Sequence, residues 1–147
     1  METEFKAAYI CFNNYYAFYS PYSETAMPQD NVRLHELLDY IRQGKIMEAM
    51  HEFYADDVVM EEPKYGRTEG LPANLEREQQ FVDSVAEFVT FETPAIAVGD
   101  NVGFYQNVLD WKTTEGGEVH LEQTVVQTWN ADGKITHERF YYDNSGG

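Results

Sequence analysis

Apolar residues in the first ninety positions recur at three- and four-residue steps, a spacing typical of amphipathic helices. Within the part that follows residue 29, it predicts three helices, over 30–44, 46–57 and 72–90. The apolar face of the first helix is made by Val32, Leu34, Leu37, Leu38 and Ile41, and that of the third by Leu75, Phe81, Val82, Val85, Phe88 and Val89. A short strand over 58–62 follows the second helix, and a loop with Tyr65, Gly66 and Gly70 leads to the third.

Beyond about Thr90 the apolar period changes from helical spacing to two, which indicates strands. Four strands are expected, over 91–98, 102–111, 119–129 and 135–142, separated by turn-forming triplets at 99–101, 115–117 and 131–133. Helices followed by hairpin-linked strands are typical of an α+β fold. The antiparallel sheet must curl over the helices to bury its long strands.

The first 29 residues form a separate unit in this interpretation. Aromatic residues recur there at helical spacing from Phe5 to Tyr19, and Ser20-Pro21 ends the pattern before a linker through Pro28. We therefore expect an N-terminal aromatic arm or helix and linker over 1–29, and one globular domain over 30–147. Packing against the domain or a partner subunit is the simplest role for the arm.

Composition and charge narrow the classes of partner. The chain has 26 acidic and 10 basic residues, a formal charge of −16, which disfavours binding to nucleic acid and to anionic membrane surfaces. A single cysteine, Cys11, allows no disulfide within the chain. The first residues include Glu2 and Glu4 and no long apolar run, so we expect a soluble, cytoplasmic protein.

Motifs for cofactors and metals are missing from the pattern. No GxGxxG, Walker, GxSxG or CxxC sequence occurs, and no two of the four histidines show the spacing of zinc ligands. We therefore expect a protein that works without a cofactor or a metal.

Three segments resemble one known superfamily. They are FYADDVVMEEP at 53–63, GRTEG at 66–70 and WNADGKITHERFYYD at 129–143, set in the order of helices and strands given above. The chain resembles the nuclear transport factor 2-like superfamily, and within it the SnoaL-like polyketide cyclases and ketosteroid isomerases. This resemblance implies a cone-shaped, curved mixed or antiparallel sheet wrapped around three helices, an internal apolar pocket and a homodimer.

The resemblance also places one catalytic position. Glu62, directly before Pro63, stands where ketosteroid isomerases have their catalytic aspartate. Their oxyanion-hole tyrosine falls near Leu37 or Leu38 here, with Tyr40 the nearest substitute, and their oxyanion-hole aspartate falls near Val125. Steroid isomerisation itself is therefore not expected.

Strand alternation gives further candidates, because residues two apart share a face. Glu138, Phe140 and Tyr142 share one face, and so do the alternate residues of 119–129; Glu61 should face away from Glu62. Glu62 and Glu138 are the candidate catalytic groups. For Glu62 the alternative is a solvated turn residue, and for Glu138 it is a pair with Arg139, Lys134 or solvent. The candidate substrate-binding residues are Tyr54, Tyr65, Phe81, Trp111, Gln123, Gln127, Trp129 and Tyr142.

Two functions fit these residues. One is a cofactor-independent isomerase or cyclase that acts on a small, mostly apolar carbonyl compound, with a carboxylate as base. The other is a non-catalytic pocket protein or dimeric scaffold, because the two oxyanion-hole groups are missing.

Overall fold

The computed structural model describes residues 29–145 and forms one layer of helices on one curved sheet. The elements in chain order are α2 (Gln29–Arg42), α3 (Ile46–Phe53), β1 (Tyr54–Glu62), β2 (Gly66–Glu69), α4 (Leu71–Ser84), β3 (Val85–Val98), β4 (Val102–Thr113), β5 (Glu118–Trp129) and β6 (Ile135–Tyr141). The predicted arm over 1–29 lies outside the described residues, except for Gln29 at the start of α2.

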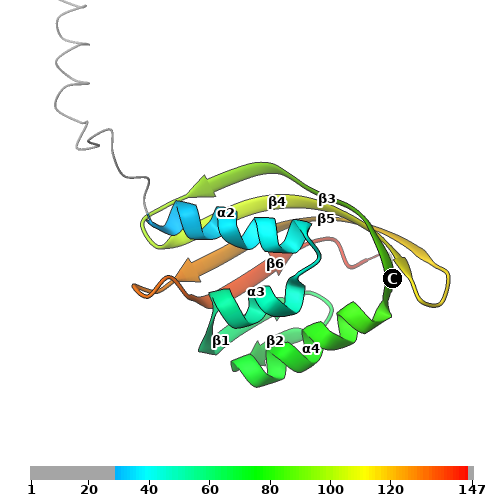
Figure 1. Cartoon of the computed structure of the whole chain (residues 1–147), viewed down its shortest axis with the longest axis horizontal. Coiled ribbons are helices and arrows are strands. Elements are labelled where there is room, and N and C mark those ends of the chain that lie inside the picture. Colours follow the sequence, from blue (N-terminus) through cyan, green and yellow to red (C-terminus); the bar gives the residue numbers. More distant parts are fainter. Residues whose placement is uncertain (1–28, 146–147) are drawn as a thin grey trace, which may run out of the picture.

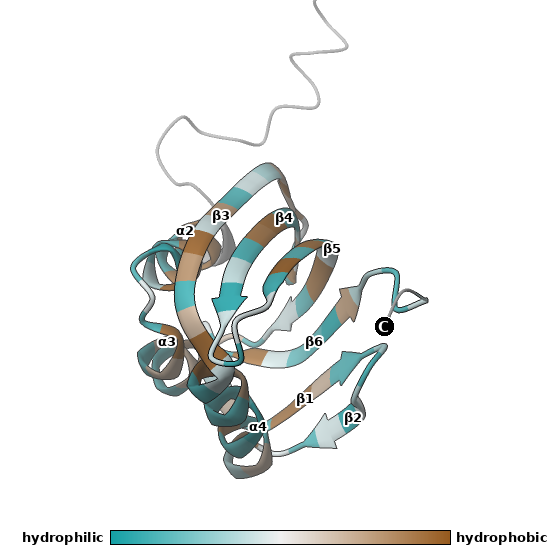
Figure 2. Ribbon diagram, turned by 90° about the vertical axis from the view of Figure 1, so that its right-hand side faces the viewer, coloured by the Kyte–Doolittle hydropathy of each residue, from teal (hydrophilic) through white to brown (hydrophobic). Residues whose placement is uncertain are grey.

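The six strands form a single sheet in the order β2-β1-β6-β5-β4-β3. All neighbours are antiparallel except β1 and β6, which are parallel, so the sheet is mixed. Register shifts interrupt the β3–β4 pairing at three places, and such bulges bend a sheet. The sheet is strongly curved without closing, as Figure 2 shows. The predicted α+β cone is confirmed.

The three helices lie on the same side of the sheet (Figure 1), and the core fills the space between the two layers. Its members are fully or almost fully buried apolar side chains, among them Leu34, Leu37, Leu38, Met50, Phe53, Val58, Val125, Trp129 and Ile135. Val32 belongs to the predicted apolar face of α2 but not to this core, because the residue is 41% exposed.

Two predicted boundaries between helix and strand are wrong. Tyr54 begins β1 rather than continuing the second helix, because its backbone is already extended and pairs with Ile135 of β6. The segment from Val85 to Thr90 belongs to β3 rather than to the third helix. Its two valines and Phe88 satisfy helical spacing as well as strand propensity, and pairing with β4 decides in favour of the strand. The short strand β2 was not predicted at all.

No helix within residues 29–145 is long and apolar enough to cross a membrane.

Candidate functional site

The strand register brings several predicted residues onto the side of the sheet that faces the helices. Gln127 of β5 lies directly opposite Glu138 of β6, and Gln123 lies opposite Asn107 of β4. Met60 of β1 is the partner of Glu138 on the other side. Along β5, exposure falls from partial at Val119, Leu121 and Gln123 to buried at Val125, Gln127 and Trp129. The inward face is therefore reached by solvent at one end and sealed at the other.

Glu138 sits at the sealed end with both oxygens occupied. The Tyr54 hydroxyl donates to Oε2 over 2.8 Å and the Gln127 amide nitrogen donates to Oε1 over 2.5 Å, and the side chain is only 1% exposed. The alternative pairs are not formed, because Arg139 contacts Glu61 and Lys134 donates to the Glu52 carbonyl.

Burial raises the pKa of Glu138 to about 7, although the hydrogen bonds from Gln127 and Tyr54 favour the charged form and oppose the shift. The pKa of Tyr54 is raised well above its usual range, first by burial and then by the nearby Glu138. Tyr54 is therefore a protonated donor at neutral pH, and Glu138 is a carboxyl group that exchanges a proton there.

Glu62 lies closer to the open end of the inward face. Its Oε1 is 3.2 Å from Nη1 of Arg77, and the Tyr142 hydroxyl donates to its Oε2 over 3.1 Å. The side chain is 15% exposed, so Glu62 is a half-enclosed, paired carboxylate rather than a freely solvated turn residue. Glu61 faces the other way, as predicted, and contacts Arg67, His137 and Arg139 on the outer surface.

Arg77 links Glu62 to a second acid that the sequence interpretation missed. Nη2 of Arg77 lies 3.6 Å from Glu78, and Nη1 also donates to Thr68 over 3.1 Å. Burial raises the pKa of Glu78, an effect that Arg77 opposes and the negative charge of Glu62 reinforces. Arg77 and Glu78 look like ordinary surface residues in the sequence, and only their spacing of three and four from Asn74 and Phe81 places them on an inward helix face.

The remaining predicted binding residues fall into three groups. Phe81 packs edge-to-face on Trp111, with ring centroids 5.6 Å apart, and both are partly buried. Trp129 is buried in the core, and its Nε1 has no hydrogen-bond partner among residues 29–145. Tyr65 is 59% exposed, and the ammonium group of Lys64 lies over its ring. The structure thus unites Tyr54, Gln127 and Glu138, and separately Glu62 with Tyr142, while Tyr65 is a surface residue.

Asn107 is a further polar residue that the sequence interpretation missed. It is 4% exposed, and its Oδ1 has no partner within the described part of the chain. The signal was available, because the same alternation that selected Gln123 on β5 also applies to β4.

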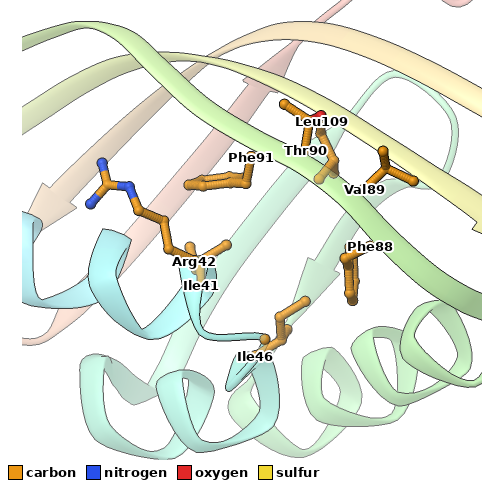
Figure 3. Close-up of a pocket in the computed structure, with 9 residues that line it drawn as sticks. Ile41, Arg42, Ile46, Phe88, Val89, Thr90, Phe91 and Leu109 are labelled. Carbon is orange, nitrogen blue, oxygen red and sulfur yellow. The ribbon is translucent and has the colours of Figure 1, made fainter.

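A small hollow of about 120 Å³ opens at a different place, between the turn that joins α2 to α3 and the strand β3 (Figure 3). Its lining is mostly apolar: Ile41, Arg42, Gly44, Ile46, Phe88, Val89, Thr90, Phe91 and Leu109. None of the predicted site residues lines it. This hollow is therefore not the apolar pocket expected around Glu62, and that pocket stays a prediction.

This arrangement of a curved open sheet over three helices is a nuclear transport factor 2-like fold. The chain belongs to the SnoaL-like domain family, whose sequence model matches residues 16–138. A comparison with curated proteins finds no match.

Several solved structures share this fold. A protein from Mesorhizobium loti, named for its likeness to SnoaL-like polyketide cyclases, has 22% identity and a TM-score of 0.64, covering 76% of this chain and 97% of that one. A nuclear transport factor 2-like protein of unknown function from Burkholderia pseudomallei has 13% identity and a TM-score of 0.69, covering 80% and 92%. An epoxide hydrolase/cyclase-like enzyme of pyran ring formation in salinomycin has 18% identity and a TM-score of 0.67, covering 81% and 96%. At these identities the likeness shows the fold alone.

Proposed function

We propose that this protein is a cofactor-independent, isomerase- or cyclase-like enzyme that moves protons on a small, mostly apolar carbonyl compound. The observation that carries the proposal is Glu138, a buried carboxyl group with a pKa of about 7, bonded to a tyrosine and an amide on the same inward face as Glu62. A group with that pKa both accepts and donates protons at neutral pH. The solved structures named for cyclase chemistry on the same fold are consistent with it.

Glu62 is the proposed base, because it is the more accessible of the two catalytic candidates and is held in place by Arg77 and Tyr142. It takes the proton from the carbon next to the carbonyl group. The electrons of that C–H bond form a C=C bond, and the carbonyl electron pair moves to oxygen. Gln123, partly exposed at the open end, donates its amide hydrogen to the developing enolate oxygen.

Glu138 is the proposed second acid–base group. Its oxygens are already bonded to Tyr54 and Gln127, so a proton passes between Glu138 and the reacting molecule through the Tyr54 hydroxyl. Around pH 7 the group is half protonated and supplies or removes a proton with little cost.

The test needs no knowledge of the natural substrate. Small cyclic ketones and β-keto esters are incubated in D₂O, and exchange at the carbon next to the carbonyl is followed by NMR. The native protein should accelerate exchange of at least one compound, and Glu62→Gln should lower that rate about a hundredfold or more. Glu61→Gln is the matched control, because Glu61 lies one residue away on the opposite face, and it should keep the native rate. Equal rates for Glu62→Gln and the native protein would remove Glu62 as the base.

A second candidate function is a non-catalytic ligand-binding or dimeric scaffold domain. The observation in its favour is that the small hollow lies away from both carboxylates, while Glu138 is only 1% exposed. In that case no ketone exchanges faster with the native protein, and light scattering shows a homodimer whose assembly is unaffected by Glu62→Gln.

A further inference from the structure

The inward side of the domain carries more acid than base. Glu62, Glu78 and Glu138 all lie there, and the only cation among them is Arg77. The nearness of these acids shows in their mutual effect, since the charge of Glu62 raises the pKa of Glu78, and that of Glu78 raises the pKa of Glu138.

The other basic residues within 29–145 are engaged elsewhere. Arg67 and Arg139 pair with Glu61 on the outer surface, and the rest contact groups away from the inward carboxylates: Arg33 with Glu36 and Glu52, Arg42 with Asp39, Lys45 with Gln43, Lys64 with the Tyr65 ring, Lys112 with Glu87 and Lys134 with the Glu52 carbonyl.

The charge of Arg77 is already shared between two of the inward carboxylates. Its two terminal nitrogens are directed to Glu62 and Glu78, and one of them also donates to Thr68. A carboxylate or phosphate entering this side would meet uncompensated negative charge in a partly desolvated place, where repulsion is stronger than in water. The formal charge of −16 adds to that repulsion at longer range.

Aromatic rings stand directly beside the more weakly paired acid. Glu78 and Phe81 are three residues apart on α4, so their side chains are neighbours on one helix face. Phe81 packs against Trp111 and also against Phe88, with ring centroids 6.1 Å apart in the second pair. Glu78 is 19% exposed, and its one ion pair within residues 29–145 is the 3.6 Å contact with Arg77. A partly exposed carboxylate on the same helix face as an aromatic residue suits an organic ammonium group, which is attracted by negative charge and by aromatic rings.

An independent observation on the same inward side of the sheet points to a ligand. Asn107 faces inward on β4, on the same side as Trp111, and its buried Oδ1 accepts no hydrogen bond from residues 29–145. A buried amide oxygen of this kind requires a donor. An N–H group of a protonated amine supplies both that donor and the positive charge that the inward acids lack.

We propose that this site binds a small molecule with a protonated amine beside an apolar or aromatic body, and that it excludes carboxylates. Glu78 is the counter-ion, Phe81 and Trp111 form the wall for the organic body, and Asn107 accepts from the ammonium group. The inference rests on the proposed function in one respect, because it makes the carbonyl substrate an amino-carbonyl compound. The binding itself requires no turnover.

Three compounds of nearly equal shape test the inference: benzylamine, benzyl alcohol and benzoate. Their binding to the full chain at pH 7 is measured by NMR titration at fixed ionic strength. Benzylamine should bind at least tenfold more tightly than benzyl alcohol, and benzoate should not bind. The proposal would be overturned by equal affinities for the amine and the alcohol, or by tighter binding of benzoate. It would also be overturned if benzylamine did not bind at concentrations on the order of 10 mM.

Glu78→Gln identifies the site, with Glu76→Gln as the matched control. Glu76 is exposed on the same helix, so its loss changes the protein charge by the same amount without touching the inward side. Glu78→Gln should abolish the preference for benzylamine and keep the affinity for benzyl alcohol, which also shows that the variant is folded. Glu76→Gln should keep the native preference. If both variants lose the preference equally, the amine binds the surface charge and the proposal is wrong.

Failure of this inference is distinguishable from failure of the proposed function. If the protein exchanges protons on neutral ketones but shows no preference for the amine, the proposed enzyme stands and the ammonium site is refuted. If the protein prefers the amine through Glu78 but exchanges no protons on ketones or amino ketones, the ammonium site stands and the proposed enzyme is refuted.

Discussion

Replacing Glu138 by glutamine should make the stability of the protein less sensitive to alkaline pH. The folded-state pKa is about 7 and the ordinary value is 4.5, a difference of about 2.5. Because the folded state binds this proton more tightly than the unfolded state does, folding is favoured below pH 4.5 and weakened as the pH rises through 7. Ionising Glu138 in the folded state lowers the free energy of unfolding by about 3 kcal/mol in full, and about 2 kcal/mol of this loss falls between pH 5.5 and 8.5. Glutamine has the same shape and no charge to desolvate, so this part of the penalty disappears.

The assay is urea unfolding of the native protein and of Glu138→Gln at several pH values in this range. The difference between their free energies of unfolding cancels the titration of all other groups, including Glu78. Native stability relative to the variant should fall by about 2 kcal/mol from pH 5.5 to 8.5. A difference that stays constant within about 0.5 kcal/mol would show that Glu138 keeps an ordinary pKa, and the reasoning from burial would be refuted.

Three other perturbations follow from single contacts, each measured by urea unfolding at pH 7. Arg77→Met leaves two half-buried carboxylates without their cation and should lower the free energy of unfolding by about 3 kcal/mol or more. At the exposed Arg67, the same substitution should lower it by less than about 1 kcal/mol, and equal losses would contradict the inward placement of Arg77. Asn74→Leu removes a buried amide that donates to three backbone carbonyls and should cost about 2–3 kcal/mol; an unchanged midpoint would show that these bonds are not formed. Gly103→Ala would bring a Cβ to 3.2 Å from Leu34 Cδ2 and 3.3 Å from Trp129 Nε1, and should cost about 1–3 kcal/mol; a stabilised variant would show that there is free space at this point.

Strand alternation was the most informative signal in the sequence. It grouped Gln127 with the alternate residues of 119–129 and Glu138 with Phe140 and Tyr142, and it set Glu61 opposite to Glu62. The strand register shows Gln127 and Glu138 side by side. A period of two leaves little freedom once one face is buried, because a shift by one residue would move the whole set to solvent.

The boundaries between helix and strand were harder to predict. In the segment from Val85 to Thr90, local preference permits both structures, and the outcome depends on pairing with β4 twenty or more residues later. The same holds for β2, whose four residues pair with β1 across a turn and are too short for a periodic pattern. Non-local pairing overrides local preference at both places.

The partners of the carboxylates could not be predicted from spacing along the chain. Tyr54 is 84 positions from Glu138, and it reaches Glu138 only because β1 lies parallel to β6. Arg77 is on a helix that the chain enters after a further strand, yet it pairs with Glu62 at the end of β1. Burial and charge pairing at this site are properties of the assembled sheet and helices, so a candidate residue can be found in the sequence while its pKa cannot.

The protonation of Glu138 tests the central claim most directly. The side-chain carboxyl carbons are labelled with ¹³C, the Glu138 signal is assigned by its loss in Glu138→Gln, and its chemical shift is followed from pH 5 to 9. A midpoint near pH 7 is predicted from the burial of this group beside Tyr54 and Gln127. A signal already fully ionised at pH 5 would contradict the account, because Glu138 would then have no proton to exchange at neutral pH.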